Sequence, residues 1–184
     1  MDHWLIKTSW GWSGLITDRD TIKTIILSSD NKSLVLKKLN ENLNSLSCCR
    51  YPLSKQPKKH KLQAFIPRFL KDINHYFNGE KVDFRYKIDL RDSSDFEKAV
   101  YKVLRTIPYG KIRTYKWVAE KVGCPKGSRA VGNALAKNPL PLIIPCHRVV
   151  RSNGSLGSFS AIGGVKLKKK LLEVEGAIPL MDSG

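Results

Sequence analysis

Residues 114–137 read TYKWVAEKVGCPKGSRAVGNALAK, and they decide the fold of the second half of the chain. Thr114 is a typical helix N-cap and predicts a helix over residues 115–122. Residues 125–127 predict a tight turn, and Ser128 predicts the cap of a second helix that fills the rest of the segment. Two short helices joined by a tight turn are typical of a helix-turn-helix, although an ordinary helical hairpin has the same pattern.

The segments on either side complete a small domain. Ser94 and Glu97 form a capping box that opens a helix, with a predicted buried stripe of Phe96, Val100, Val103 and Leu104. Residues 140–150 are apolar and predict an extended segment, and residues 152–154 predict the turn of a hairpin wing. An amphipathic helix is expected over residues 164–175 and ends at Gly176. These elements predict a winged helix-turn-helix domain over residues 91–178, with a short tail at 179–184.

The first ninety residues give weaker signals. Apolar runs at residues 24–27 and 34–36 suit short strands or helix fragments, and the basic, Pro-containing segment at residues 50–61 predicts an exposed loop. Helical spacing of apolar residues predicts a helix over residues 65–77, and alternation predicts a strand over residues 81–90. We therefore expect an α+β protein whose residues 1–90 form a small αβ domain, a short antiparallel sheet plus helix, of structural or unclear role.

The charge balance points to a polyanionic partner. The chain has 33 Lys and Arg against 16 Asp and Glu, a formal net charge of +17. Such a surplus favours nucleic acid through phosphate neutralisation, although a lysine-rich solvated surface is the ordinary alternative. No stretch approaches the roughly 18 apolar residues that span a bilayer, and residues 1–10 make a poor signal peptide. No membrane partner is expected.

The cysteines do not indicate disulfides or a metal site. Cys48 and Cys49 are adjacent, Cys124 and Cys146 are isolated, and the four histidines stand at positions 3, 60, 75 and 147. This pattern matches neither a secreted disulfide framework nor a zinc site. No cofactor motif appears either. We expect no cofactor, no metal, and a reducing compartment, the cytoplasm (or the nucleus in a eukaryote).

The chemistry concentrates in residues 144–149, IPCHRV. A thiol is nucleophilic only as the thiolate, so a reactive Cys146 needs a base or a positive field nearby. His147 and Arg148 offer both. An isolated Cys-His pair is nevertheless more often a buried structural cysteine beside a surface histidine. In an extended strand neighbouring side chains also point to opposite faces, so His147 reaches Cys146 only at a bend or through water.

The wider context resembles one family. Residues 138–150, NPLPLIIPCHRVV, are similar to the active-site segment of the O⁶-alkylguanine-DNA alkyltransferases (methylated-DNA–protein-cysteine methyltransferases). Residues 110–115, GKIRTY, and 128–135, SRAVGNAL, extend the likeness, as do the downstream Gly154, Gly157, Ser160, Gly163, Gly164, Lys166, Glu175 and Gly176. The resemblance covers about residues 96–176 and is far weaker before them.

The resemblance implies the activity and the roles of the reacting groups. A monomer would take the alkyl group of O⁶-alkylguanine, and of O⁴-alkylthymine, from double-stranded DNA onto Cys146, once per molecule. His147 would act as a base through a water molecule, and Glu175 would orient it. Tyr115 would protonate the departing guanine near N3. Asn138 would tie the segment before Cys146 to the helix-turn-helix.

The resemblance also implies how DNA is bound. Arg129 would enter the base stack in place of the flipped nucleotide. Around it the small helix face of Ser128, Ala130 and Gly132 would approach the minor groove. The expected substrate pocket consists of Pro141, Val149, Phe159 and Ser160. Position 159 is Phe where many members carry Tyr, and residues 161–162 look like an insertion, so the pocket shape can differ from the family's.

Two other functions fit parts of the pattern. An alkyltransferase-like protein would recognise the lesion without transferring the group, but such relatives typically have another residue in place of Cys146. A winged-helix transcriptional regulator would bind particular duplex sequences, but it gives the Pro-Cys-His-Arg segment no role. Both predict no alkyl group on the protein after exposure to damaged DNA.

Overall fold

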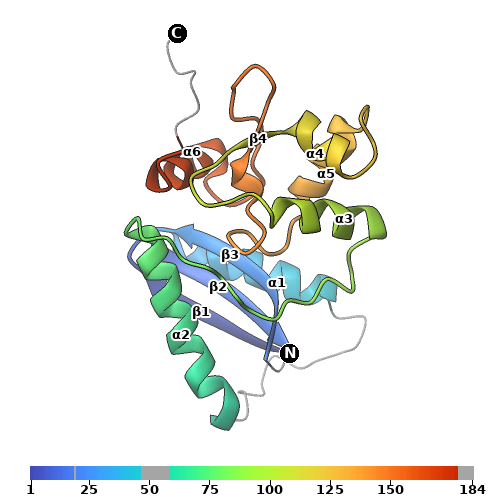
Figure 1. The fold of residues 1–184 in the computed structure, drawn as a ribbon. Coiled ribbons are helices and arrows are strands. Elements are labelled where there is room, and N and C mark those ends of the chain that lie inside the picture. Colours follow the sequence, from blue (N-terminus) through green and yellow to red (C-terminus); the bar gives the residue numbers. More distant parts are fainter. Residues whose placement is uncertain (19, 47–58, 178–184) are drawn as a thin grey trace. The chain divides into compact units, whose positions relative to one another are not determined.

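The structure, a computed structural model, describes residues 1–18, 20–46 and 59–177 (Figure 1). The chain divides into two units, Met1–Asp89 and Leu90–Gly184, where the sequence predicts a boundary after residue 90. Within the described ranges, no helix is long and apolar enough to cross a membrane.

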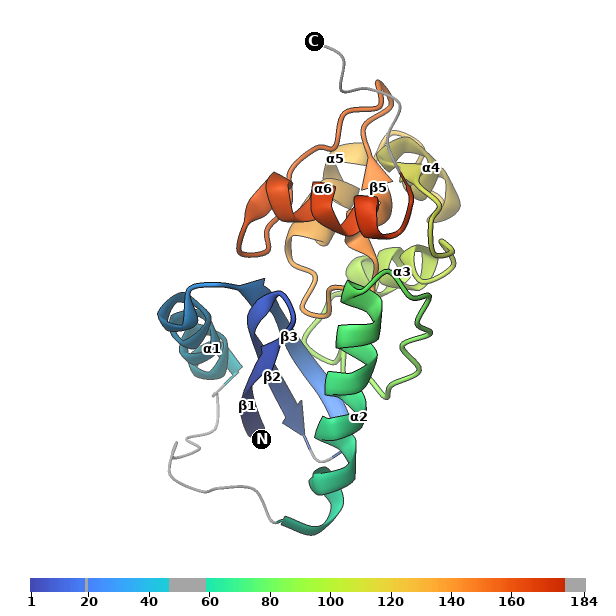
Figure 2. The same cartoon turned by 90° about the vertical axis from the view of Figure 1, so that its left-hand side faces the viewer.

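The first unit is built on an antiparallel sheet of three strands in the order β1 (Asp2–Thr8), β2 (Gly11–Asp18) and β3 (Thr21–Ser29). Helices α1 (Lys32–Leu46) and α2 (Lys59–Phe77) lie on opposite sides of this sheet (Figures 1 and 2). Because a helix covers each face, the middle strand β2 is buried along five consecutive residues rather than at alternate ones.

Two expectations for this unit need correction. The loop predicted for residues 50–61 falls outside the described residues up to position 58, and residues 59–61 are helical because α2 starts at Lys59. The prolines that suggested a loop, Pro52 and Pro57, precede that point, and the residues after them are compatible with a helix. The apolar run at 24–27 lies in β3, whereas the run at 34–36 lies in α1.

The strand predicted over residues 81–90 was also wrong, since only a parallel bridge between Ile22 and Ile88 forms there. The alternation is real: Phe84 packs on Tyr76 with ring centroids 5.6 Å apart, and Tyr86 on Phe69 at 5.5 Å. However, the backbone N–H groups of residues 85 and 86 bond to carbonyls two residues back, at 2.8 and 3.0 Å. These local bonds take the place of the hydrogen bonds to a neighbouring strand that a β-strand requires.

The second unit is mainly helical. In chain order it contains α3 (Asp95–Leu104), β4 (Arg113–Thr114), α4 (Tyr115–Lys121), α5 (Ser128–Ala136), the short 3₁₀ turn η1 (Cys146–Arg148), β5 (Val149–Val150) and α6 (Gly164–Val174). Together with the antiparallel sheet of the first unit, this confirms the α+β fold class.

The helix caps follow the sequence with one exception. The capping box of Ser94 and Glu97 and the Thr114 cap of α4 are both present. Ser128 is instead the first residue of α5, and Gly127 holds the N-cap position without a side-chain hydrogen bond. The turn before α5 closes through the Gly127 N–H to the Cys124 carbonyl at 2.7 Å. A Cβ on residue 127 would lie 2.9 Å from that oxygen, so the turn requires glycine.

The buried stripe of α3 differs slightly from the predicted one. Val100 and Leu104 are buried as expected, and Tyr101 joins them, whereas Phe96 and Val103 stay partly exposed. The Tyr101 hydroxyl donates to the Ala134 carbonyl at 3.0 Å. This bond fixes α5 against α3.

The segment of residues 140–150 is not extended as predicted. A turn forms first, with the Ile144 N–H bonded to the Leu140 carbonyl at 2.8 Å and Leu142 at φ 74°. The η1 turn follows, and only Val149–Val150 is extended, pairing in parallel with β4. The expected turn at residues 152–154 is present, since the Gly154 N–H bonds to the Arg151 carbonyl at 3.0 Å, but residues 155–160 carry no strand.

The final helix was predicted correctly. It begins at Gly164, ends at Val174 with Glu175 as its C-cap, and Gly176 follows at φ 65°. A positive φ suits glycine because it has no Cβ. The chain direction after Glu175 therefore depends on residue 176.

Candidate active site

Cys146 begins the η1 turn and is 5% exposed. The Asn138 amide nitrogen Nδ2 donates to the Cys146 Sγ at 3.0 Å and to the Ile144 carbonyl at 2.8 Å, while its Oδ1 accepts from the Leu140 N–H at 3.0 Å. One side chain thus holds both the thiol and the turn that precedes it. The resemblance implies that Asn138 ties the segment before Cys146 to the helix-turn-helix, and the structure places its side chain against Leu140, Ile144 and Cys146.

His147 and Glu175 form a buried pair next to the thiol segment. The side chains of both are fully buried, and His147 Nε2 lies 2.9 Å from Glu175 Oε1. Glu175 comes from the C-cap of α6, so α6 packs on η1 through this contact. The structure therefore brings these two residues together as the sequence predicts.

Arg148 takes a different place from the one suggested by the sequence. Its Nε and Nη2 donate to Glu175 at 2.9 and 2.8 Å, and its Nη1 donates to the Ile107 carbonyl at 2.7 Å. The Gly110 N–H donates to Glu175 Oε2 at 3.1 Å. Arg148 therefore pairs with the Glu175 carboxylate, and the positive charge near the Cys146 thiol comes from another residue.

Lys168 supplies that charge, and sequence reasoning missed it. Its side chain is buried, and Nζ donates to the carbonyls of Val149, at 2.6 Å, and Leu156. Burial lowers the pKa of Lys168 to about 8. One signal was available: Lys168 falls on the buried stripe of α6 beside Leu171 and Leu172. Lys166, which is part of the resemblance but was given no role, is exposed.

The titration of these groups follows from their burial. Burial raises the pKa of the Cys146 thiol, against the opposing effects of the Asn138 hydrogen bond and the Lys168 charge. Burial lowers the pKa of His147, against the effect of Glu175. Burial alone would raise the pKa of Glu175, but the hydrogen bonds from His147 and Arg148 hold it well below its usual range. At neutral pH, thiol and imidazole are thus neutral and Glu175 is ionised.

Tyr115 is half-buried at the start of α4, between α5 and the segment before α6. A Cβ on Gly157 would lie 3.0 Å from the Tyr115 hydroxyl, and one on Gly132 would lie 3.8 Å from its ring. Burial and the charge of a Cys146 thiolate raise the pKa of Tyr115. The phenol is therefore protonated at neutral pH.

The residues predicted to contact DNA and the damaged base differ in their solvent exposure. Arg129 and Ala130 are exposed on the first turn of α5, and Ser128 and Gly132 are partly buried. Of the predicted pocket, Pro141 and Val149 are buried, Phe159 is partly buried and Ser160 is exposed. Phe159 and Ser160 belong to the segment that leads into α6, where the Gly164 N–H bonds to the Ala161 carbonyl at 2.9 Å.

Cys124 and Cys146 are both free thiols, the first exposed and the second buried. Cys48 and Cys49 lie outside the described residues. In the part of the chain that the structure describes, no group of three or more His, Cys, Asp and Glu side chains is placed to hold a metal ion.

Fold and site together define a class of protein: a helix-turn-helix unit that carries a buried cysteine beside a histidine–glutamate pair. Comparison with known families agrees, because residues 95–177 match the model of the "6-O-methylguanine DNA methyltransferase, DNA binding domain".

Individual relatives are methylated-DNA–protein-cysteine methyltransferases. A methylated-DNA–protein-cysteine methyltransferase of Mycobacterium bovis is 45% identical over 103 residues, which cover 56% of this chain and 61% of the relative's length. The enzyme of that name from Metallosphaera sedula is 49% identical over 116 residues, covering 62% of this chain and 70% of the relative.

Solved structures extend the likeness over both units. The O⁶-methylguanine methyltransferase of Mycobacterium tuberculosis is 30% identical, with a TM-score of 0.72 over 98% of this chain and 96% of that one. The O⁶-methylguanine-DNA methyltransferase of Pyrococcus kodakaraensis is 25% identical, with a TM-score of 0.71 over 95% of this chain and 98% of that one. The chain belongs to the methylated-DNA–protein-cysteine methyltransferase family.

Proposed function

We propose that this protein repairs DNA by moving the alkyl group of O⁶-alkylguanine, and of O⁴-alkylthymine, onto Cys146. The observation that carries this proposal is the buried thiol held by Asn138 at 3.0 Å, next to a histidine that is bonded to a buried glutamate. A structural relative from M. tuberculosis, 28% identical with a TM-score of 0.69, was crystallised in complex with DNA.

The reaction begins with deprotonation of the thiol. Because His147 Nε2 is engaged with Glu175, the proton passes through a water molecule to Nδ1. The ionised Glu175 stabilises the imidazolium that forms, and Asn138 and Lys168 stabilise the thiolate. A neutral resting thiol becomes nucleophilic only when the pair beside it accepts the proton.

The transfer is a single displacement at the alkyl carbon. A bond forms between Cys146 Sγ and the carbon while the carbon–O⁶ bond breaks, and its electron pair stays on guanine. Tyr115 gives its proton to guanine N3, and the proton held by His147 restores the phenol. In the net reaction the thiol loses one proton and guanine gains one, with the Tyr115 phenol restored between them, and the alkyl group ends on sulfur as a thioether. The thioether is a stable product that does not regenerate the thiol, so each molecule reacts once.

The burial of Cys146 sets a requirement on the DNA. At 5% exposure the thiol cannot meet a base that is stacked in a duplex, so the damaged nucleotide has to leave the helix. We assign Arg129, exposed on the first turn of α5, to the space left in the stack. The small residues Ala130 and Gly132 let α5 approach the minor groove of the duplex closely.

Intact mass before and after incubation with duplex DNA carrying O⁶-methylguanine tests the proposal. We expect one added methyl group per chain, located on the Cys146 peptide, and none in Cys146→Ser. A methyl group on another residue, or several methyl groups removed from DNA per chain, would contradict it. Lesion binding without any mass change would indicate a recognition protein, and sequence-dependent binding indifferent to the lesion would indicate a transcriptional regulator.

A further inference from the structure

Trp117, on the first helix of the helix-turn-helix, carries two cations on its indole ring. The Arg113 guanidinium carbon lies 5.3 Å from the ring centroid and the Lys121 Nζ lies 5.8 Å from it. Both basic residues are exposed, whereas Trp117 is partly buried. These distances are in the range of cation–π contacts.

The backbone fixes this arrangement. The Trp117 N–H donates to the Thr114 hydroxyl at 3.1 Å, the capping bond of α4, and the Arg113 Nη1 donates to the Ile112 carbonyl at 2.9 Å. Lys121 follows Trp117 by four residues, which places it on the same helix face. On the inner side of α4, Val118 and Ala119 are buried. The two cations are thus held on the outer side of the helix.

Neither cation has an acidic partner among the side chains that the structure describes. Within residues 1–18, 20–45 and 65–177, neither Arg113 nor Lys121 takes part in an ion pair. By contrast, Lys137 of the same unit pairs with Glu97 at 3.0 Å. Both positive charges are exposed, so each is available to an anion outside the protein.

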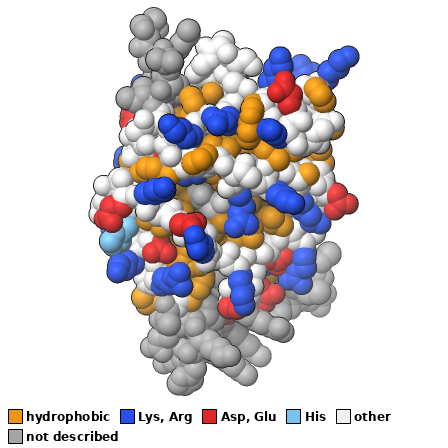
Figure 3. Space-filling model, in the orientation of Figure 1, with side chains coloured by type: hydrophobic (Ala, Val, Ile, Leu, Met, Phe, Trp, Pro, Cys, Tyr) orange, Lys and Arg blue, Asp and Glu red, His pale blue; other side chains and the backbone are white. Residues whose placement is uncertain are grey.

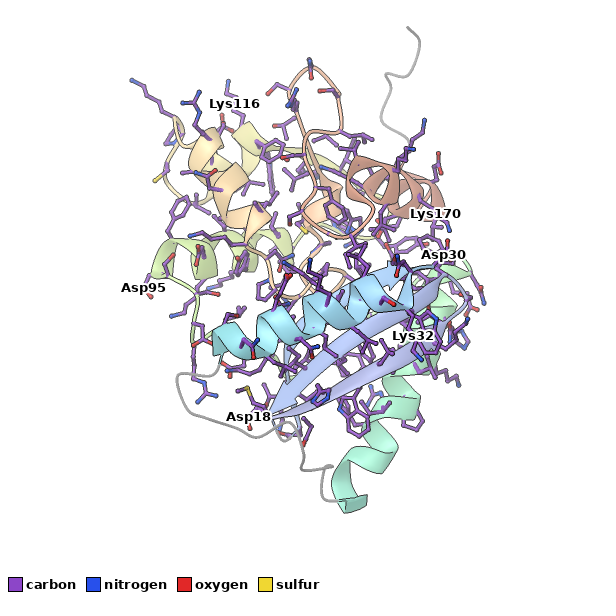
Figure 4. All side chains as sticks on the ribbon, turned by 180° about the vertical axis from the view of Figure 1, so that it is seen from behind. Asp18, Asp30, Lys32, Asp95, Lys116 and Lys170 are labelled. Atoms are coloured by element: carbon purple, nitrogen blue, oxygen red, sulfur yellow. The ribbon has the colours of Figure 1, made fainter. Side chains whose placement is uncertain are left out.

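The surroundings of this pair are also basic. Lys116 extends outward from the start of α4 (Figure 4), and Lys126 and Arg129 are exposed on the turn and on α5 that follow. Glu120 is the one acidic residue of α4. Most charged side chains on the molecular face in Figure 3 are likewise Lys and Arg. A ligand complementary to these exposed cations carries several negative charges.

We propose that Arg113 and Lys121, positioned by Trp117, bind the phosphates of duplex DNA beside the recognition helix. This proposal rests on the proposed function and adds contacts from β4 and α4 to the one expected from α5. The contact is to the backbone and carries no base preference. It therefore strengthens binding to intact and damaged duplex equally.

The salt dependence of binding tests it. For a duplex carrying O⁶-methylguanine, and for the same duplex undamaged, the logarithm of the association constant is measured against that of salt concentration. Each lost phosphate contact lowers the slope by about 0.9. We expect Arg113→Ala and Lys121→Ala each to show this loss on both duplexes, with affinity roughly five- to tenfold lower at 0.1 M salt. Arg113→Lys keeps the charge and should keep the slope.

The ring is tested separately. Trp117→Leu retains both cations, so we expect an unchanged slope with affinity reduced about two- to fivefold through lost positioning. Thermal unfolding of each variant shows that the fold is kept. The matched control is Lys32→Ala, because the Lys32 Nζ makes the same kind of contact within the first unit, 4.7 Å from the Trp12 ring centroid.

Reaction with free O⁶-benzylguanine separates this inference from the proposed function. The base has no phosphate, so transfer of its benzyl group to Cys146 should proceed at the wild-type rate in all five variants. Transfer by the wild type together with wild-type slopes in Arg113→Ala and Lys121→Ala would overturn the phosphate contact and leave the repair function standing. An equal slope change in Lys32→Ala would also overturn it. Absence of methyl transfer to wild-type Cys146 from the duplex carrying O⁶-methylguanine would overturn the repair function itself.

Discussion

At the scale of single residues, the candidate site is a set of charged and polar side chains arranged around the Cys146 thiol. Glu175 accepts from His147, from two nitrogens of Arg148 and from the Gly110 N–H, so its charge is fully compensated in the resting state. Because Oε1 is shared by His147 and Arg148, the carboxylate stays ionised and still contacts the imidazole. A proton that reaches His147 then meets an anion that is already in position.

Replacing Glu175 therefore separates reactivity from stability. Glu175→Gln leaves the buried Arg148 cation without an anion, which costs about 3–5 kcal/mol of folding free energy. The double variant Arg148→Met with Glu175→Gln removes both charges, so we expect it to regain most of that stability while alkyl transfer stays roughly 100-fold slower. Single-turnover kinetics and urea unfolding measure the two effects.

Glu173→Gln is the control for this experiment, since Glu173 is an exposed carboxylate on the same helix. It should leave both the rate and the stability at wild-type values. Wild-type transfer by the folded double variant would show that Glu175 has only a structural role.

Lys168 is the second residue whose charge acts on the thiol. In Lys168→Met the pKa of Cys146 should rise further because the neighbouring cation is lost. We expect alkylation of Cys146 by iodoacetamide to be about tenfold slower near neutral pH and its pH midpoint to rise by about one unit. Mass spectrometry of the Cys146 peptide gives the rate without interference from Cys124. Lys168→Arg should lie close to the wild type, and Lys166→Met, an exposed lysine, should equal it. An unmoved midpoint in Lys168→Met would refute the electrostatic role.

At the scale of elements, features that depend on neighbouring residues were predicted well, whereas features that depend on contacts distant in the sequence were not. The capping box at Ser94 and the helix end at Gly176 depend on a few neighbouring residues, and both were correct. The strand over residues 81–90 failed because alternation reports burial, whereas a strand also needs a partner for its backbone. Residues 140–150 failed for a related reason: the Asn138 side chain and a positive φ at Leu142 turn an apolar segment that looks extended.

For the candidate site too, some residues were found from the sequence and one was missed. Cys146, His147 and Glu175 were found through the resemblance, and the structure brings His147 and Glu175 together across 28 residues of sequence. Lys168 was missed because it stands in the run VKLKKK, residues 165–170, where residue type alone does not distinguish a buried lysine from exposed ones. Its place on the apolar stripe of α6, beside Leu171 and Leu172, is the signal that distinguishes it.

The segment between β5 and α6 offers a test at this scale. A Cβ on Gly157, which has φ 69°, would lie 3.0 Å from the Tyr115 hydroxyl. We expect Gly157→Ala to displace Tyr115 and slow transfer from alkylated DNA about tenfold or more, while iodoacetamide still reacts with Cys146 at the wild-type rate. Gly123→Ala is the matched control, because Gly123 has φ 78° with nothing within 4 Å of the added atom. Equal rates for both variants would show that backbone strain, rather than the contact with Tyr115, sets the effect.

At the scale of the whole molecule, charge dominates. The chain carries a net charge of +17 at neutral pH, and it would carry +33 if its sixteen acidic residues were all protonated. Repulsion among these charges destabilises the compact state as pH falls. The buried Glu175 adds a specific loss, since it joins α6 to Arg148 and to the Gly110 backbone within one unit.

The sign of that loss follows from the pKa of Glu175, which is held below its usual value of 4.5 in the folded protein. A carboxylate with a lowered folded pKa contributes stability that is complete above the unfolded pKa and is lost as pH falls through the folded one. We therefore expect the free energy of unfolding of the wild type to fall by at least about 1 kcal/mol more than that of the Arg148→Met, Glu175→Gln double variant between pH 6 and pH 3. Urea unfolding at fixed ionic strength measures this difference. General repulsion acts nearly equally on both proteins, because the double variant removes one charge of each sign. Parallel pH profiles would therefore show that the Glu175 carboxylate titrates alike in the folded and unfolded chains.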